Sequence, residues 1–415
     1  MKRRDIFSRT GVFKKFLLGL MLAPAVNVFA ADFGFVLAPS AEYVSDGKGA
    51  PAMENTGFTG ILTPWISAAP GEKTSLYFSG KLTFEYAGEN RAWERPPVFE
   101  LERTELNFRP LPALYIALGR QRYRDNAGMI ASGLFDGVSA AAGFSGARLF
   151  LGAFYTGLVY KKTAEILMTE GDRERYARDL DYGDLETYFA SRRILVPLGL
   201  EFPGLSPRFT LALNLLAQFD VNGSSPLHGQ YLEIRLGFEA ADTLHFTLTG
   251  IGAAAENAGE LKANFAGALG ADWDLPGPLA DMLRGELRWG GGAVNGRIIP
   301  FMPVNGISQG TVFTPTLAGL MNGRLSYTAR PHETVSLSAE ALLFWRTDLE
   351  TFRDPELKEL STERFLGTEI YGSLVWATQS ALRFSLGGGA FFPGGAFKDN
   401  AAPRWKLNGG IIISL

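Results

Sequence analysis

Charged residues that alternate with apolar residues carry the clearest chemical information in this 415-residue sequence. In LRGELRW (residues 283–289), every second side chain is charged: Arg284, Glu286 and Arg288. A period of two predicts a β-strand with one charged face and one apolar face that carries Trp289. A charged face of this kind holds water and selects solutes by charge, which is the chemistry of a pore lining.

The same alternation recurs along the chain. The apolar faces are predicted to meet hydrocarbon and the charged faces a polar interior. In FELERTELNFRP (99–110), strict alternation puts Phe99 and Leu106 on opposite faces, so we expect a β-bulge near Arg103. The inward, pore-lining candidates are Lys81, Glu85, Glu100, Glu102, Arg103, Glu105, Arg120, Glu233, Arg235, Glu239, Arg284, Glu286, Arg288, Arg324, Glu340, Arg346, Glu369, Arg383 and Lys406. Individually, such residues can instead pair across neighbouring strands and only stiffen the wall.

Residues suited to catalysis or metal binding are sparse. The three histidines are widely separated, and His245 has no serine nucleophile motif beside it, so we expect no enzyme and no cofactor. The absence of cysteine excludes disulfides and Cys-ligated metals. Asp179, Asp181 and Asp184 supply oxygen ligands at a spacing that could hold Ca²⁺, although the full calcium-loop pattern is missing and a solvated acidic loop is the better interpretation.

The elements that must position these residues are about 18 strand-like segments, with 16 as the alternative count. They include predicted strands at 186–202 and 312–328. Most are longer than the roughly five or six residues of a soluble strand and match the roughly nine to eleven needed to cross a bilayer. Tight turns follow the even-numbered segments and longer polar stretches the odd-numbered ones. The sequence therefore predicts an all-β fold, a transmembrane antiparallel β-barrel.

The N-terminal residues predict the compartment. Residues 1–30 combine six basic residues with a short apolar run and end in Val28-Phe29-Ala30, which is typical of a cleaved signal peptide. Removing this segment takes away a net charge of +5, so the overall charge of −3 becomes −8 and nucleic acid is an improbable partner. We expect residues 31–415 to form one barrel in the outer membrane of a diderm bacterium, in contact with its lipid.

Two segments raise further expectations. The last strand (404–415) alternates Trp405, Leu407, Ile411 and Ile413 on one face, so it should close against the first strand and engage the barrel-assembly machinery. The longest loop, 157–185, could fold into the mouth and narrow the pore, or stay outside as a short helix.

A short stretch, LYIALGRQRYRDNAGMIASGLFDGVSAAAGF (114–144), resembles the alginate-export family of outer-membrane barrels. Gly119, Arg120 and Gln121 end a strand, and Asp136 and Gly137 begin the next one. The resemblance implies an eighteen-stranded barrel whose cation-lined lumen passes an anionic polysaccharide. Here the glutamates of the predicted lumen are about as numerous as its basic residues, which departs from that pattern.

The favoured interpretation is a porin-like channel for passive passage of small hydrophilic, anionic or saccharide, solutes. The alternative is a non-conducting barrel whose loops bind a partner at the surface, as in an adhesin. A soluble secreted β-protein is a third class. The sequence leaves the oligomeric state open.

Overall fold

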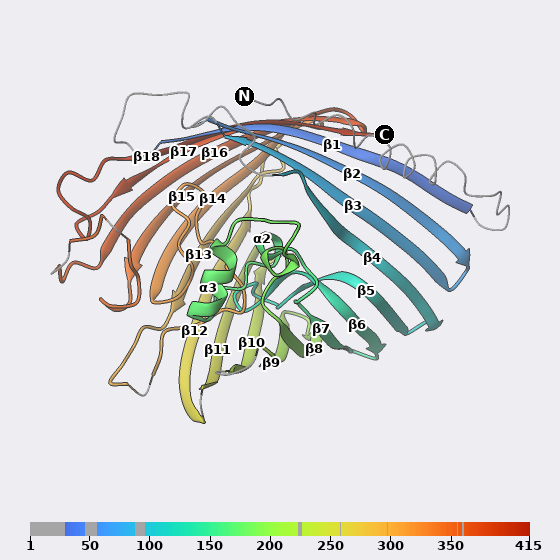
Figure 1. The fold of residues 1–415 in the computed structure, drawn as a ribbon, viewed down its shortest axis with the longest axis horizontal. Helices are drawn as coiled ribbons and strands as arrows, with labels where there is room; N and C mark the ends of the chain where they lie inside the picture. The colour runs from blue at the N-terminus through green and yellow to red at the C-terminus, as the bar shows by residue number, and fades with distance from the viewer. Residues whose placement is uncertain are drawn as a thin grey trace.

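The computed structural model describes residues 30–45, 56–87, 96–222, 226–257, 259–296, 298–354, 356–358 and 361–415. These residues form one 18-stranded antiparallel barrel, so the fold predicted from the sequence is confirmed (Figure 1). The predicted signal peptide lies outside the described residues except for Ala30, which begins the first strand. No helix in the described ranges is long and apolar enough to cross a membrane.

Each strand pairs with its neighbours in the chain, and the circle closes between the last strand and the first. Leu37 lies opposite Ile413, and the Phe35 N–H donates to the Leu415 carbonyl at 2.9 Å, which confirms the predicted closure. The strands are β1 (Ala30–Ser45), β2 (Thr56–Gly71), β3 (Thr74–Ala87), β4 (Val98–Leu111), β5 (Leu114–Arg124), β6 (Ser132–Phe144), β7 (Ala147–Tyr155), β8 (Arg193–Ser206), β9 (Phe209–Asp220), β10 (Leu227–Ala241), β11 (Leu244–Asn257), β12 (Glu260–Asp274), β13 (Met282–Gly290), β14 (Leu320–His332), β15 (Val335–Arg346), β16 (Phe365–Gln379), β17 (Leu382–Pro393) and β18 (Arg404–Ser414).

Connection lengths follow strand parity with two exceptions. Even-numbered strands are followed by two-residue turns, except β12, which residues 275–281 connect to β13. Among odd-numbered strands, β11 breaks the rule, because only residues 258 and 259 separate it from β12. The β11–β12 ladder continues to Asn257 opposite Glu260. Residues that would form a loop at the other odd-numbered connections are therefore part of the strands here.

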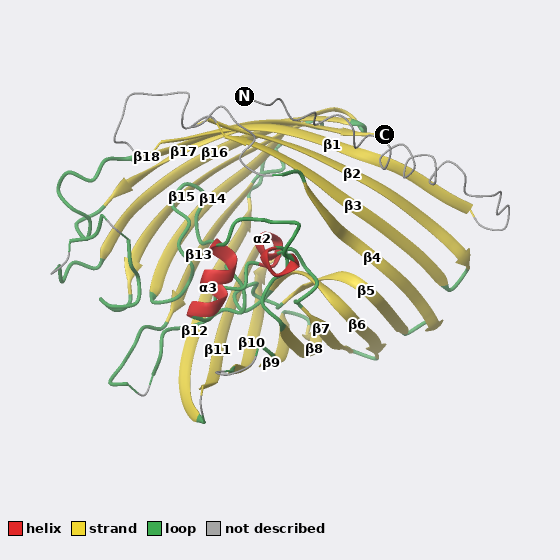
Figure 2. Cartoon of the chain, in the orientation of Figure 1, coloured by secondary structure: helices red, strands yellow, loops and turns green. Residues whose placement is uncertain are grey.

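Two strands begin later than the sequence predicts. The segment predicted at 186–202 starts at Arg193, and the one predicted at 312–328 starts at Leu320. In both cases the preceding residues fold against the inside of the barrel. Residues 156–192 contain α2 (Lys161–Ala164), α3 (Glu170–Ala177) and the 3₁₀ turn η4 (Leu185–Thr187), and the strands surround these helices (Figure 2). The long loop is therefore both helical and infolded.

An apolar core fills the interior beside β7–β12. Its wall residues include Phe154, Leu195 and Ile251, and the infolded segments contribute others such as Val159 and Phe301. Burying these side chains holds the segments against the wall, at roughly 25 cal/mol per Å² of apolar surface removed from water. A second apolar cluster packs beside β14–β17, so infolded chain is held against two parts of the wall.

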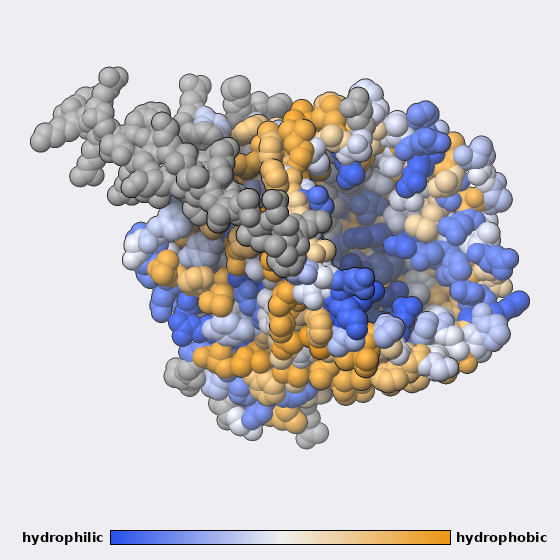
Figure 3. Space-filling view, turned by 90° about the vertical axis from the view of Figure 1, so that its right-hand side faces the viewer, coloured by the Kyte–Doolittle hydropathy of each residue, from blue (hydrophilic) through white to orange (hydrophobic). Residues whose placement is uncertain are grey.

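The outer surface carries exposed leucine, phenylalanine and tryptophan side chains on alternate strand positions. Figure 3 shows a belt of hydrophobic residues beside a hollow lined by hydrophilic ones. The two faces of the strand LRGELRW follow this pattern. Leu287 and Trp289 are exposed on the outer face, and Arg288 forms an ion pair with Glu286 on the inner face.

Candidate channel and its constriction

Three infolded segments meet inside the barrel: the β5–β6 tip (125–131), the β7–β8 segment (156–192) and the β13–β14 segment (291–319). The Val304 N–H donates to the Ile130 carbonyl at 2.7 Å, and the Gly306 N–H donates to the Glu165 carbonyl at 2.8 Å. The carboxylate of Asp125 accepts N–H groups of its own tip, including that of Ala131 at 2.7 Å. Burial raises the pKa of Asp125, although these hydrogen bonds oppose the shift. Together the segments form a constriction.

Two predicted pore-lining glutamates are anchors for these segments. Glu233 is fully buried and accepts the N–H of Ala127 at 2.7 Å and that of Asn126 at 3.2 Å. Glu369 is also fully buried and accepts three consecutive backbone N–H groups, those of residues 311–313. Their prediction as lining residues is wrong. Both point inward, but infolded backbone covers them and uses the carboxylates as acceptors.

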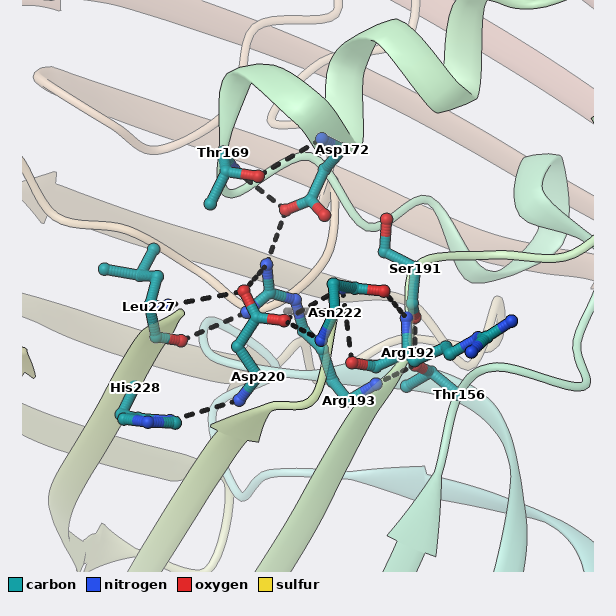
Figure 4. A network of polar contacts seen from close by, with 10 residues as sticks. All are labelled: Thr156, Thr169, Asp172, Ser191, Arg192, Arg193, Asp220, Asn222, Leu227 and His228. Carbon is teal, nitrogen blue, oxygen red and sulfur yellow. Dashed lines mark hydrogen bonds and ion pairs between the residues drawn. The ribbon is translucent and has the colours of Figure 1, made fainter. Parts of the chain in front are cut away.

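Arg193 anchors the β7–β8 segment (Figure 4). It begins β8, is fully buried, and contacts Asp172 of α3 at 2.6 Å and Asp220 at the end of β9 at 3.3 Å. Asp172 also completes a capping box with Thr169 at the start of α3. Leu227, the first residue of β10, accepts a further bond from the guanidinium at 3.2 Å. One arginine thus joins α3 to three strands.

The stretch that carries the family resemblance forms a seam between β4 and β5. These strands pair only from Thr104 opposite Arg120 down to their turn. Gly119, next to Arg120, has a φ of +107°, and an added Cβ would lie 1.9 Å from the Thr104 carbonyl oxygen. A glycine is required for this backbone, which coincides with the point where the two strands part.

Arg120 closes the seam and does not line open lumen as predicted. It binds Asp136 through two nitrogens, at 2.9 and 2.7 Å, and donates to the carbonyls of Leu101 and Leu158. Its side chain is 5% exposed. It lies on the side of β5 opposite the inward Gln121, the side that also carries the exposed Leu118, so alternation itself puts it on the outer face.

Side chains of the β7–β8 segment replace strand pairing along the upper edge of β4. The hydroxyl of Tyr182 donates to the Pro97 carbonyl at 2.7 Å, and that of Tyr188 donates to the Phe99 carbonyl at 2.6 Å. Thr163 donates to Glu100 at 2.6 Å. Exposed strand edges are prone to mispairing, and here the loop covers the edge.

Most other predicted lining residues form ion pairs within the wall. The expected bulge is present, because Ser79 faces Arg103 while Gly80 faces Leu101, leaving Glu102 as the extra residue near Ser79. The pairs are Lys81–Glu100 at 3.2 Å, Arg103–Glu105 at 2.7 Å, Arg284–Asp272, Arg288–Glu286 at 3.0 Å, Arg324–Glu340 at 3.6 Å and Lys406–Glu42 at 3.0 Å. The prediction for Arg346 is wrong, because it is buried against the carbonyls of residues 361 and 363.

Some charges stay available to solutes. Arg235, Glu239 and Arg383 have no ion pair among the described residues. Arg122 and Arg124 are exposed on the opposite face of β5 from the core residue Tyr123. Sequence reasoning missed the buried anchor Arg193, because its acidic partners come from segments that are distant in the chain.

The calcium hypothesis is not supported by the geometry. Asp181 accepts the N–H of Gly183 at 2.8 Å, and Asp184 accepts that of Glu186 at 3.0 Å. These carboxylates cap local turns. The described residues hold no group of three acidic or histidine side chains placed to bind a metal ion.

Comparisons with known proteins bear on the fold. No protein-family model and no curated protein matches the sequence. Among solved structures, OccAB1 of Acinetobacter baumannii has a TM-score of 0.58 at 12% identity and covers 93% of this chain and 97% of its own. OccK2 (OpdF) of Pseudomonas aeruginosa, solved with glucuronate, has a TM-score of 0.57 at 14% identity, covering 92% and 98%. OprD of Pseudomonas aeruginosa scores 0.56 at 12% identity, covering 93% and 95%.

These neighbours are outer-membrane porins, and they show a porin-like β-barrel. The identities are low, so the likeness extends to the fold alone. The resemblance to the alginate-export family receives no support from these matches and stays a prediction.

Proposed function

We propose that this chain is an outer-membrane channel through which small hydrophilic solutes diffuse passively. The observation that carries the proposal is the organisation of the interior, in which two apolar clusters hold the infolded segments against the wall and a hollow lined by hydrophilic residues stays open (Figure 3). A wide barrel narrowed in this way restricts passage to small molecules. In the proposal, residues 1–30 export the chain, lipid surrounds residues 31–415, and β18 engages the assembly machinery.

The free basic residues support a preference for anions. Arg235 and Arg383 have no acidic partner within ion-pair distance among the described residues, whereas most lumenal glutamates are paired or buried. The Arg235 guanidinium donates to the Asn126 carbonyl at 2.5 Å. The neighbour OccK2 was solved with glucuronate, a sugar acid, which agrees with this direction. The constriction argues for small sugar acids and against a polysaccharide.

The test is single-channel recording of the folded chain in a planar bilayer, with the reversal potential measured under a salt gradient. We expect conductance steps with an anion bias, and a shift toward cations in Arg235→Gln and Arg383→Gln. Arg208→Gln, which removes the same charge from the exposed β8–β9 turn, should leave the reversal potential unchanged. A folded barrel without steps would refute the channel and favour the alternative, a barrel whose loops bind a surface partner.

A further inference from the structure

Trp65 faces the lumen, unlike the other tryptophans in the described part of the chain. Trp65 lies opposite the inward Ser79, while its neighbour Ile66 lies opposite Phe78 on the outer face. The tryptophans on outward faces are Trp273, Trp289, Trp345, Trp376 and Trp405, and Trp93 is outside the described residues. Outward tryptophans suit the membrane interface. An indole in a hydrated lumen needs a different explanation.

The indole of Trp65 packs on the wall and keeps part of its surface exposed. An added Cβ at Gly34 would lie 2.8 Å from its Cζ2 atom, so the indole packs on the backbone of β1. The residue is still half-exposed, which leaves ring surface open to the lumen. The Tyr77 ring lies at an angle of only 12° to it with centroids 6.5 Å apart, so the two rings are offset and extend one another.

Charged and polar groups border this aromatic surface. The Arg103 guanidinium lies 4.8 Å from the centroid of the Tyr77 ring, and two bonds to Glu105, at 2.9 and 2.7 Å, fix its orientation. Arg103 remains 44% exposed at its side chain, so part of its donor set faces water. On the next strands, the Tyr115 hydroxyl donates to Asn107 at 2.6 Å.

We propose that Trp65 and Tyr77, with Arg103 at their edge, form a subsite for a pyranose ring. A pyranose has an apolar C–H face that fits a flat aromatic surface, and hydroxyls around its rim that fit planar hydrogen-bonding groups. Tyr77 is the fourth residue of β3, so the subsite lies near the β2–β3 turn, at the short-turn mouth of the barrel. The inference rests on the proposed function in that solutes must enter the lumen, and it adds that the lumen recognises the ring form of a sugar.

The first experiment measures binding by fluorescence of the folded full chain in detergent, which does not require conduction. The probe is maltotriose, and the comparison solute is mannitol, an acyclic polyol without a ring face. We expect maltotriose to change the tryptophan emission of the wild type and mannitol to leave it unchanged. Trp65→Phe should abolish the change. Trp273→Phe, which removes an outward tryptophan near the same end of the barrel, should preserve it.

The second experiment measures how strongly maltotriose blocks single-channel current. Stacking on an aromatic ring contributes about 1 kcal/mol, so Trp65→Ala should weaken the apparent affinity about fivefold, and Trp65→Phe should weaken it less. Equal block in the wild type and Trp65→Ala, or equal effects of maltotriose and mannitol, would overturn the subsite. Conductance without sugar binding refutes only the subsite, whereas sugar binding without conductance refutes only the channel.

Discussion

Neutralising Asp172 should release α3 from the barrel wall. Asp172→Asn keeps an acceptor for the Thr169 N–H but removes the charge opposite Arg193, which is fully buried. Breaking a buried pair costs about 3–5 kcal/mol, and we take about 3 kcal/mol because Asp220 remains 3.3 Å from the guanidinium. At about 1.4 kcal/mol per factor of ten, the open population of the segment should rise about a hundredfold.

Trypsin cleavage within α3 measures this opening, because Arg173 and Arg175 become substrates only when the helix leaves the wall. When reclosing is faster than cleavage, the rate follows the open population. The control is Glu170→Gln, which removes an exposed partner of Arg173 worth less than about 1 kcal/mol. If Asp172→Asn were cleaved no faster than Glu170→Gln while both barrels stayed folded, Arg193 would not hold the segment, and our account of the constriction would be wrong.

Two further changes test the seam and the outer loops. Gly119→Ala should destabilise the barrel by about 3 kcal/mol, because the backbone of an alanine is strained at a φ of +107° and its Cβ would clash with the Thr104 carbonyl oxygen. A urea midpoint equal to that of the wild type would contradict this prediction. Burial alone would raise the pKa of Asp348, but hydrogen bonds from Thr351 and Ala293 outweigh it and hold the pKa below the usual 3.8. The stability it contributes is present above that value and is lost as pH falls through the lower folded pKa. Protection of this loop against hydrogen exchange, corrected for the intrinsic exchange rate at each pH, should therefore fall below about pH 3.8 in the wild type but not in Asp348→Asn.

Strand number, closure and the direction of most faces follow from properties that are local in sequence. Period-two alternation determines which side of a strand is apolar, and turn residues mark where the chain reverses. Even the bulge in β4 was predictable, since Phe99 and Leu106 cannot both meet lipid without it. The late starts of β8 and β14 were not predictable in this way, because residues 186–192 and 312–319 pack against distant parts of the interior.

Alternation also says nothing about what covers an inward face. Glu233, Glu369 and Glu340 occur in strands of similar pattern, but only Glu340 remains partly exposed, in a pair with Arg324. The other two accept N–H groups of backbone more than 50 residues away in the chain. Because infolded backbone brings unsatisfied donors into the lumen, a barrel with long infolded segments needs inward carboxylates as acceptors. An inward glutamate in such a barrel is therefore as much a structural anchor as a selectivity residue, and the free arginines are the better guide to what passes.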